Sequence, residues 1–191
     1  MSAFGRSSLR KSLLSIALIL ATATAPAAGS ETVRREPGED IDGRPFSLSA
    51  PKGHVLLVSF SSSWCPTCLL ELPVLDRLFR RYEKDGLKVA AIGVDDSSEA
   101  LKKMRDNLRL SFPVVLDLEN IYKERFRVQE LPVLIAFDEA GEVFELTDPR
   151  TGLQANRITG TREWLQPQGK ASIEKALSSA DARRTQKQAA L

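Results

Sequence analysis

The feature that most constrains this chain is an apolar run that leads into a pair of cysteines. Residues 54–60 (HVLLVSF) form a continuous apolar run of strand length, which predicts a strand buried on both faces. The motif WCPTC follows at 64–68, and leucines then recur at helical spacing until the DG pair at 85–86. Cys65 and Cys68 are therefore expected where a buried strand ends and a helix begins.

This position gives the cysteine pair a chemistry. The unpaired N–H groups and the positive end of the helix dipole stabilise a thiolate at Cys65, and the thiolate is the nucleophile in disulfide exchange. Cys68, one turn into the helix, is expected to be more buried and to act as the resolving thiol. Three other uses stay open: a half-site for zinc between chains, two buried structural thiols, or a structural disulfide. The last would close a four-residue loop and stabilise the fold by only about 2 kcal/mol.

Composition excludes several classes of protein. Two cysteines and one histidine in 191 residues cannot build a disulfide-dense scaffold or a four-ligand Cys/His zinc site within the chain. A hydrophobic content of 42% argues against a disordered protein, and no segment reaches the roughly 18 apolar residues of a transmembrane helix. The length predicts one domain with a sizeable core.

The net charge of +2 belongs to the N-terminus, because the first 28 residues hold three basic side chains and no acidic one. Without these three charges the remainder carries −1, so nucleic-acid binding has no basic surplus to depend on. A basic start, an apolar run at 13–20 and small residues at 21–28 predict a secretory signal peptide over 1–28. An uncleaved anchor formed by residues 12–28 is the alternative. Both imply the periplasm or another extracytoplasmic, oxidising space.

The rest of the chain is divided by composition and hydrophobic periodicity. We expect a linker at 29–40, one domain at 41–180 and a polar tail, prone to fraying, at 181–191. Alternating strands and helices predict an α/β layer fold with a mixed sheet. Strands are expected at 88–94, 112–116 and 133–137, a hairpin around Asp42-Gly43, helices at 97–108 and 119–126, and a last amphipathic helix at 167–178. Residues 147–162 receive no assignment.

Six motifs together resemble the thioredoxin superfamily, and within it the exported TlpA/ResA/CcmG-like thiol–disulfide oxidoreductases. The resemblance covers about residues 40–177, and the motifs are DGRPFSL with KG, WCPTC, ELP, FPVVLD, LP and DEAG. It implies a thioredoxin-like fold, in which helices flank a central mixed β-sheet, with an N-terminal β-hairpin extension and a central insertion.

The resemblance also assigns roles to residues around the cysteines. Pro132 corresponds to the family's cis-proline, which would leave the backbone of Leu131 free to pair with an extended substrate segment. Trp64 corresponds to an aromatic side chain that shapes the site. Glu71, one helical turn after Cys68, corresponds to a buried acid that manages protons, and burial would raise its pKa. The implied catalytic residues are Cys65, Cys68 and Glu71, and the implied substrate-binding residues are Trp64, Leu131 and Pro132.

The chain departs from the family pattern at four places. Ser59 stands where ordinary thioredoxins carry an aspartate, which makes Glu71 the one nearby candidate for proton transfer. Three serines at 61–63 replace an aromatic-Ala-x sequence, and Val133 replaces a frequent threonine. Residues 147–160 exceed the family hairpin, which suggests a partner-specific insertion.

The resemblance implies an exported protein-disulfide reductase that needs no cofactor and no metal and acts as a monomer. Its expected partners are disulfide-containing proteins, apocytochrome c first, and a membrane electron donor of the DsbD/CcdA type. Two rivals are kept: a peroxiredoxin-like thiol peroxidase, since Ser62 lies three residues before Cys65, and a non-catalytic binding module. His54 is given no catalytic role, and Trp164 is assigned to packing alone.

Overall fold

The structure is a computed structural model in which residues 38–189 are described. The predicted signal peptide or anchor at 1–28 and most of the predicted linker at 29–40 lie outside the described residues. Within 38–189, no helix is both long enough and apolar enough to cross a membrane.

The centre of the fold is a mixed six-stranded sheet with the strand order β10-β6-β3-β4-β5, and β7 also pairs with β6. Strands β3 and β4 run parallel, as do β4 and β5, whereas β6 is antiparallel to β3. Every residue of β3 and β6 is buried, as their continuous apolar sequences predict. The strands are β3 (Val55–Ser61), β4 (Leu87–Gly93), β5 (Val114–Leu116), β6 (Val133–Phe137), β7 (Val143–Phe144) and β10 (Ile158–Thr159).

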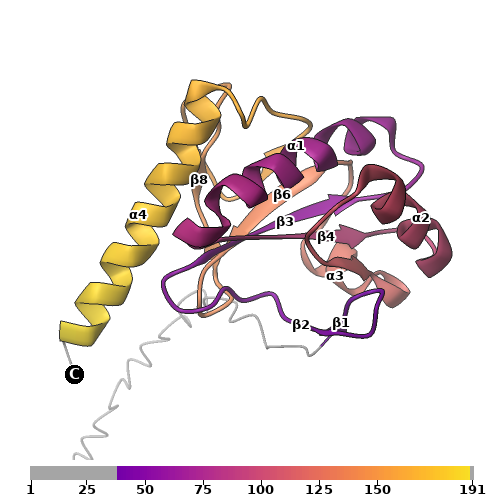
Figure 1. The fold of residues 1–191 in the computed structure, drawn as a ribbon, viewed down its shortest axis with the longest axis horizontal. Coiled ribbons are helices and arrows are strands. Elements are labelled where there is room, and N and C mark those ends of the chain that lie inside the picture. The colour runs from indigo at the N-terminus through magenta and orange to yellow at the C-terminus, as the bar shows by residue number, and fades with distance from the viewer. Residues whose placement is uncertain (1–37, 190–191) are drawn as a thin grey trace, which may run out of the picture. The chain divides into compact units, whose positions relative to one another are not determined.

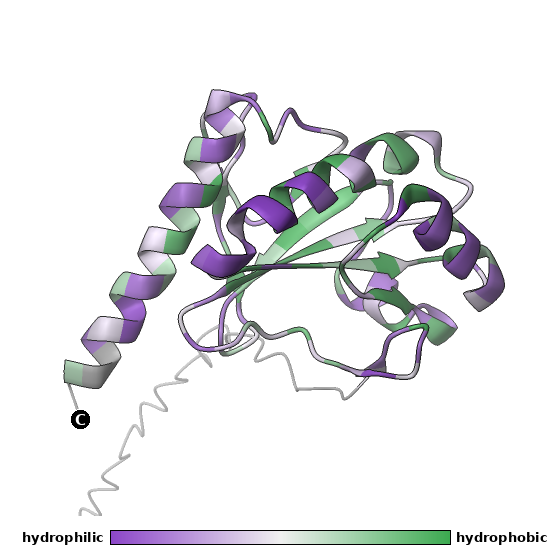
Figure 2. Ribbon diagram, viewed as in Figure 1, coloured by the Kyte–Doolittle hydropathy of each residue, from purple (hydrophilic) through white to green (hydrophobic). Residues whose placement is uncertain are grey.

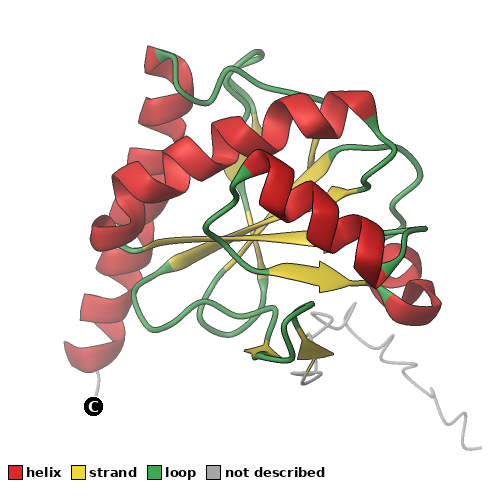
Figure 3. Cartoon of the chain, turned by 45° about the vertical axis from the view of Figure 1, so that its right-hand side comes forward, coloured by secondary structure: helices red, strands yellow, loops and turns green. Residues whose placement is uncertain are grey.

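Helices cover both faces of this sheet, which confirms the predicted α/β layers (Figures 1 and 3). Helices α1 (Pro66–Tyr82), α2 (Ser98–Leu108) and α4 (Pro167–Ala189) contribute to the same hydrophobic cluster as one face of β3. Helix α3 (Ile121–Arg125) and the N-terminal extension pack on the other face. Figure 2 shows the apolar strands between helices whose outer surfaces are largely hydrophilic. A short 3-10 turn, η1 (Glu83–Asp85), follows α1, and a second one, η2 (Leu118–Asn120), precedes α3.

The hairpin predicted around Asp42-Gly43 is present. Strands β1 (Gly38–Glu39) and β2 (Pro45–Phe46) pair antiparallel. The carboxylate of Asp40 accepts hydrogen bonds from the backbone N–H groups of Asp42 and Arg44, both at 2.9 Å, so the turn is held by one side chain.

The region without a sequence assignment proves to be a hairpin inserted into an edge strand. β7 pairs with Ala136 and Phe137 at one end of β6, and β10 pairs with Val133 and Leu134 at the other. Between them, β8 (Leu146–Thr147) and β9 (Gln154–Ala155) pair only with each other. Each of these four strands has two residues, which is too short for a period-2 pattern to be recognised.

Helix α4 differs from the prediction, which ended it at Ser178 and expected residues 181–191 to fray. The helix continues to Ala189 (Figure 1). Its later residues are rich in alanine, arginine, glutamine and lysine, which favour helix without an apolar period. A tertiary contact also holds this part, since the guanidinium of Arg183 lies 4.3 Å from the centre of the Phe144 ring.

Candidate active site

Cys65 occupies the junction between β3 and α1 that the sequence predicts. It is the N-cap residue of α1, with an extended backbone, and its Sγ accepts a hydrogen bond of 3.2 Å from the backbone N–H of Cys68. The hydroxyl of Thr67 lies 3.3 Å from the same sulfur. Donors at a helix N-terminus otherwise lack partners, so this geometry stabilises negative charge on Cys65.

The two cysteines form a disulfide in this structure, with Cα atoms 5.3 Å apart. Cys65 is 4% exposed and Cys68 is fully buried. Cys68 is thus the more deeply buried of the two, as the sequence predicts, and Cys65 alone of the pair lines a surface cavity.

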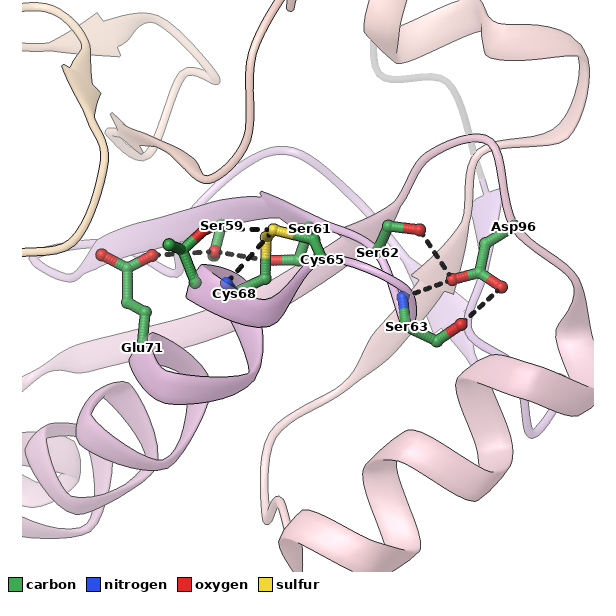
Figure 4. The surroundings of a disulfide bond; sticks show 9 residues. Ser59, Ser61, Ser62, Ser63, Cys65, Cys68, Glu71 and Asp96 are labelled. Carbon is green, nitrogen blue, oxygen red and sulfur yellow. Dashed lines mark hydrogen bonds between the residues drawn. A yellow bond between two sulfur atoms is a disulfide. The ribbon is translucent and has the colours of Figure 1, made fainter.

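Glu71 lies on α1 beyond the disulfide and is buried, with 2% of its surface exposed. The hydroxyl of Ser59, on β3, donates a long hydrogen bond of 3.5 Å to its carboxyl group and also lies 2.8 Å from the hydroxyl of Ser61 (Figure 4). Burial raises the pKa of Glu71 to about 7, although the indole of Trp164, the Ser59 hydroxyl and the charge of Arg162 each act to lower it. This carboxyl group can therefore accept and release a proton near neutral pH.

Two residues of the Glu71 environment were missed by the sequence reasoning. Trp164, assigned to packing, is fully buried in the hydrophobic core, and its indole also acts to lower the pKa of Glu71. Arg162 forms a two-pronged ion pair with Asp148, with N–O distances of 2.8 and 3.0 Å. The sequence offered only a general indication for Trp164: a buried tryptophan usually has a hydrogen-bond partner for its N–H group.

Two of the three serines at 61–63 share an acceptor, Asp96, in the loop that follows β4. The carboxylate of Asp96 accepts hydrogen bonds from the Ser63 backbone N–H at 2.6 Å and from the hydroxyls of Ser62 and Ser63 at 2.9 and 3.0 Å. In Figure 4 the disulfide lies between Glu71 on one side and this cluster on the other. Asp96 thus ties down the loop that leads into Cys65, a role that its sequence position did not indicate.

The predicted substrate-binding residues also meet at Cys65. Trp64 is 60% exposed, and its indole N–H donates to the carbonyl oxygen of Asp95 at 3.0 Å. Trp64, Cys65 and Leu131 line one cavity of about 240 Å³. The Leu131–Pro132 peptide bond is cis, as the resemblance implies, and the carbonyl oxygen of Pro132 accepts a hydrogen bond of 2.8 Å from the N–H of Gly160.

Among residues 38–189, no three His, Cys, Asp or Glu side chains are grouped so that they could hold a metal ion.

Comparison with known proteins gives a family match and named relatives. The model of the AhpC/TSA family matches residues 25–145. The thiol-disulfide oxidoreductase ResA of Geobacillus kaustophilus is 28% identical over 107 residues, which are 56% of this chain and 62% of that protein. ResA of Bacillus subtilis is 27% identical over 108 residues, 56% of this chain and 60% of the relative. The chain thus spans about three fifths of the length of these curated relatives.

Solved structures support the thioredoxin-like fold. A thiol:disulfide interchange protein of the thioredoxin family from Chlorobium tepidum has a TM-score of 0.55 at 24% identity, covering 75% of this chain and 97% of that one. StoA of Bacillus subtilis has a TM-score of 0.56 at 19% identity, covering 76% and 95%. A secreted disulfide oxidoreductase of Mycobacterium tuberculosis has a TM-score of 0.54 at 18% identity, covering 76% and 96%. The fold is therefore thioredoxin-like, with a mixed sheet flanked by helices and an N-terminal hairpin.

Proposed function

The chain belongs to the AhpC/TSA family, and we propose that it is a thiol–disulfide oxidoreductase acting on disulfides of protein substrates. The observation that carries this proposal is the arrangement of its cysteines: the slightly exposed Cys65 caps α1 and the buried Cys68 lies directly behind it. The names of the curated relatives support the same activity.

The reaction begins with the reduced pair. The Cys65 thiolate, stabilised by the N–H of Cys68 and the positive end of α1, attacks one sulfur of a substrate disulfide. A bond forms between Cys65 and that sulfur, the substrate disulfide breaks, and the other substrate sulfur leaves as a thiolate. The product of this step is a mixed disulfide between the two proteins.

Cys68 resolves this intermediate. Its thiol gives its proton to the carboxylate of Glu71, for which a pKa of about 7 is suitable. The Cys68 thiolate then attacks Cys65 Sγ, the Cys65–Cys68 disulfide forms, and the second substrate sulfur leaves as a thiolate. Two electrons have passed to the substrate, and an external dithiol donor restores the reduced pair by the reverse exchange.

The substrate segment binds beside Cys65. Trp64 and Leu131 line the cavity there, and within residues 38–189 the backbone N–H and C=O of Leu131 have no hydrogen-bond partner. An extended substrate strand can pair with that backbone, so that its disulfide lies next to Cys65. Pro132 follows Leu131 and leads directly into β6.

The setting we propose is extracytoplasmic, with electrons flowing toward the substrate. It is supported by the signal-like pattern of residues 1–28 and by a similar structure described as secreted. We propose apocytochrome c as the first substrate to test and a membrane donor of the DsbD/CcdA type as the source of electrons, since the resemblance implies both.

Trapping of the mixed disulfide tests this function. Cys68→Ser leaves Cys65 able to attack and unable to be released, so a covalent complex with substrate protein should accumulate and should dissolve in dithiothreitol. The double variant Cys65→Ser/Cys68→Ser is the matched control and should trap nothing. If Cys68→Ser traps no partner and the wild-type protein does not reduce insulin, the proposed function is wrong.

The two rival functions make different demands on the site. A thiol peroxidase would use the hydroxyl of Ser62 near the reactive sulfur, whereas this hydroxyl donates to Asp96, away from Cys65 (Figure 4). Hydrogen peroxide turnover well above that of a free thiol would revive this alternative. For a non-catalytic binding module, Cys65→Ala would leave partner binding and phenotype intact.

A further inference from the structure

We propose that Arg157 is a positioning residue for substrate: its guanidinium fixes residues 126–131, the loop between α3 and β6 that presents Leu131. The inference rests on the proposed function for what this loop binds. The pairing of Arg157 with the loop is a property of the folded protein, and it can be measured without any substrate.

The first observation is that one guanidinium bonds two successive carbonyl groups. Arg157 lies in the turn between β9 and β10. It donates from Nη2 to the carbonyl oxygen of Phe126 and from Nη1 to that of Arg127, the latter at 3.1 Å. The last carbonyl groups of a helix lack partners within the helix, and these two follow directly on α3. The rigid fork of a guanidinium suits such a pair of acceptors, and its positive charge suits the end of a helix.

The second observation is the constrained turn at which the loop begins. Arg127 has a φ of +47°, in the left-handed region that favours glycine. The turn is closed by the N–H groups of Arg127 and Val128, which donate to the carbonyl oxygens of Glu124 at 3.0 Å and Lys123 at 2.9 Å. Arg157 bonds the carbonyl group of Arg127 itself, so its guanidinium stabilises the turn in this unfavourable conformation.

The third observation is that the same segment also holds the other end of the loop. The N–H of Gly160 donates to the carbonyl oxygen of Pro132 at 2.8 Å, and β10 pairs with the start of β6. Residues 157–160 therefore contact the chain on both sides of the loop. Between these fixed ends, residues 128–131 line the cavity that also includes Cys65.

A loop fixed at both ends has less conformational freedom to lose when an extended substrate strand pairs with it. Without the guanidinium, ordering the loop would oppose each binding event, so the affinity for a protein substrate would fall. The reactivity of Cys65 would be unchanged, because this sulfur is stabilised by the N–H of Cys68 on α1. Arg157 therefore affects substrates that use the backbone of Leu131, and not a small disulfide that makes no strand contact.

The kinetic test compares a protein disulfide with a small one. Arg157→Met removes both donors and keeps a long side chain. With dithiothreitol as electron source, its KM for insulin should rise about tenfold while kcat stays within about twofold of the wild type. Its rate with hydroxyethyl disulfide should equal that of the wild type. An unchanged KM for insulin, or an equal loss of rate with both disulfides, would overturn the proposal.

Two further variants separate the fork from its charge. Arg150→Met is the matched control, because Arg150 belongs to the same insertion and its guanidinium donates to the carbonyl oxygen of Thr161. It removes the same charge and should leave the KM for insulin unchanged. Arg157→Lys keeps the charge, but a compact ammonium group does not span both carbonyl groups, so its KM should stay raised. Complete recovery in Arg157→Lys, or an equal rise in Arg150→Met, contradicts positioning by the fork.

Hydrogen exchange tests the pairing without substrate. In the oxidised protein, the amides of Arg127 and Val128 should exchange about tenfold faster in Arg157→Met than in the wild type, because the turn that protects them is no longer held. The amides of β4 should exchange as before. Unchanged exchange at Arg127 and Val128 would overturn the proposal. If their exchange accelerates and the wild-type protein reduces no protein disulfide, the proposed function fails and the pairing stands.

Discussion

Glu71 shows how a single residue can be tuned by its surroundings. It is a carboxyl group in the core with one long hydrogen bond from Ser59, so burial dominates and its pKa rises to about 7. Ordinary thioredoxins carry an aspartate at the position of Ser59, as the resemblance indicates. In this chain the residue on β3 is Ser59, and the acidic residue near the disulfide is Glu71 on α1.

This raised pKa predicts a pH-dependent stability. Between the unfolded value of 4.5 and about 7, the folded protein holds a proton on Glu71 that the unfolded chain has released, so stability falls as the pH rises through this window. Glu71→Gln removes this pH dependence. The difference in free energy of unfolding, variant minus wild type, should therefore be about 3 kcal/mol larger at pH 8 than at pH 4. Urea unfolding of the oxidised proteins measures this difference.

Glu145→Gln is a matched control, because Glu145 is exposed. It should change stability little at either pH. The account of Glu71 is contradicted if Glu71→Gln and the wild type show the same dependence of stability on pH between 4 and 8.

At the scale of elements, sequence patterns located those parts of the fold that carry a long apolar signal. β3, β6 and the start of α1 follow from continuous apolar runs and leucine spacing. The strands β8, β9 and β10 were missed, because a strand of two residues cannot show a period. The end of α4 was placed too early, because residues 181–189 are held by helix propensity and by Arg183 on Phe144 rather than by an apolar face.

The residues of the candidate site also fall into two groups, those that local sequence motifs indicate and those that they do not. Cys65, Cys68, Glu71 and the cis Pro132 were located from local motifs and the resemblance. Asp96 and Trp164 were not identified, because each acts through space on a residue distant in the sequence. No local pattern records that the Asp96 carboxylate accepts from Ser62, or that the Trp164 indole acts to lower the pKa of Glu71.

The close packing of α4 against Trp164 predicts that adding a methyl group at Gly169 lowers the stability of the fold. In Gly169→Ala, the new Cβ would meet the Cα and the carbonyl oxygen of Trp164 at 2.5 and 2.6 Å, contacts that no rotamer can relieve. The free energy of unfolding should fall by about 2 kcal/mol, as in other overpacked sites. Urea unfolding checks this value.

Ser178→Ala, at an exposed position of the same helix, is the control and should leave stability within about 0.5 kcal/mol. Equal stabilities of Gly169→Ala and the wild type would mean that α4 does not hold Trp164 as described.

The whole molecule brings distant segments to one end of the central sheet. β3 and β4 are parallel, so the loops that follow them, with Cys65 and with Asp96, lie at the same edge. The antiparallel β6 begins at that edge, which places Leu131 beside Cys65. The thioredoxin-like architecture thus brings the cysteine pair, Asp96 and Leu131 to the same end of the sheet.

The central claim is that Cys65 and Cys68 are a reversible dithiol that donates electrons, and a redox titration tests it most directly. The purified protein is equilibrated with dithiothreitol or glutathione buffers, and the oxidised fraction is counted by thiol alkylation and mass spectrometry. We predict a reversible two-electron transition near the thioredoxin value of about −270 mV. A pair that stays oxidised across these buffers, or a potential near the strongly oxidising value of about −120 mV, would contradict the claim.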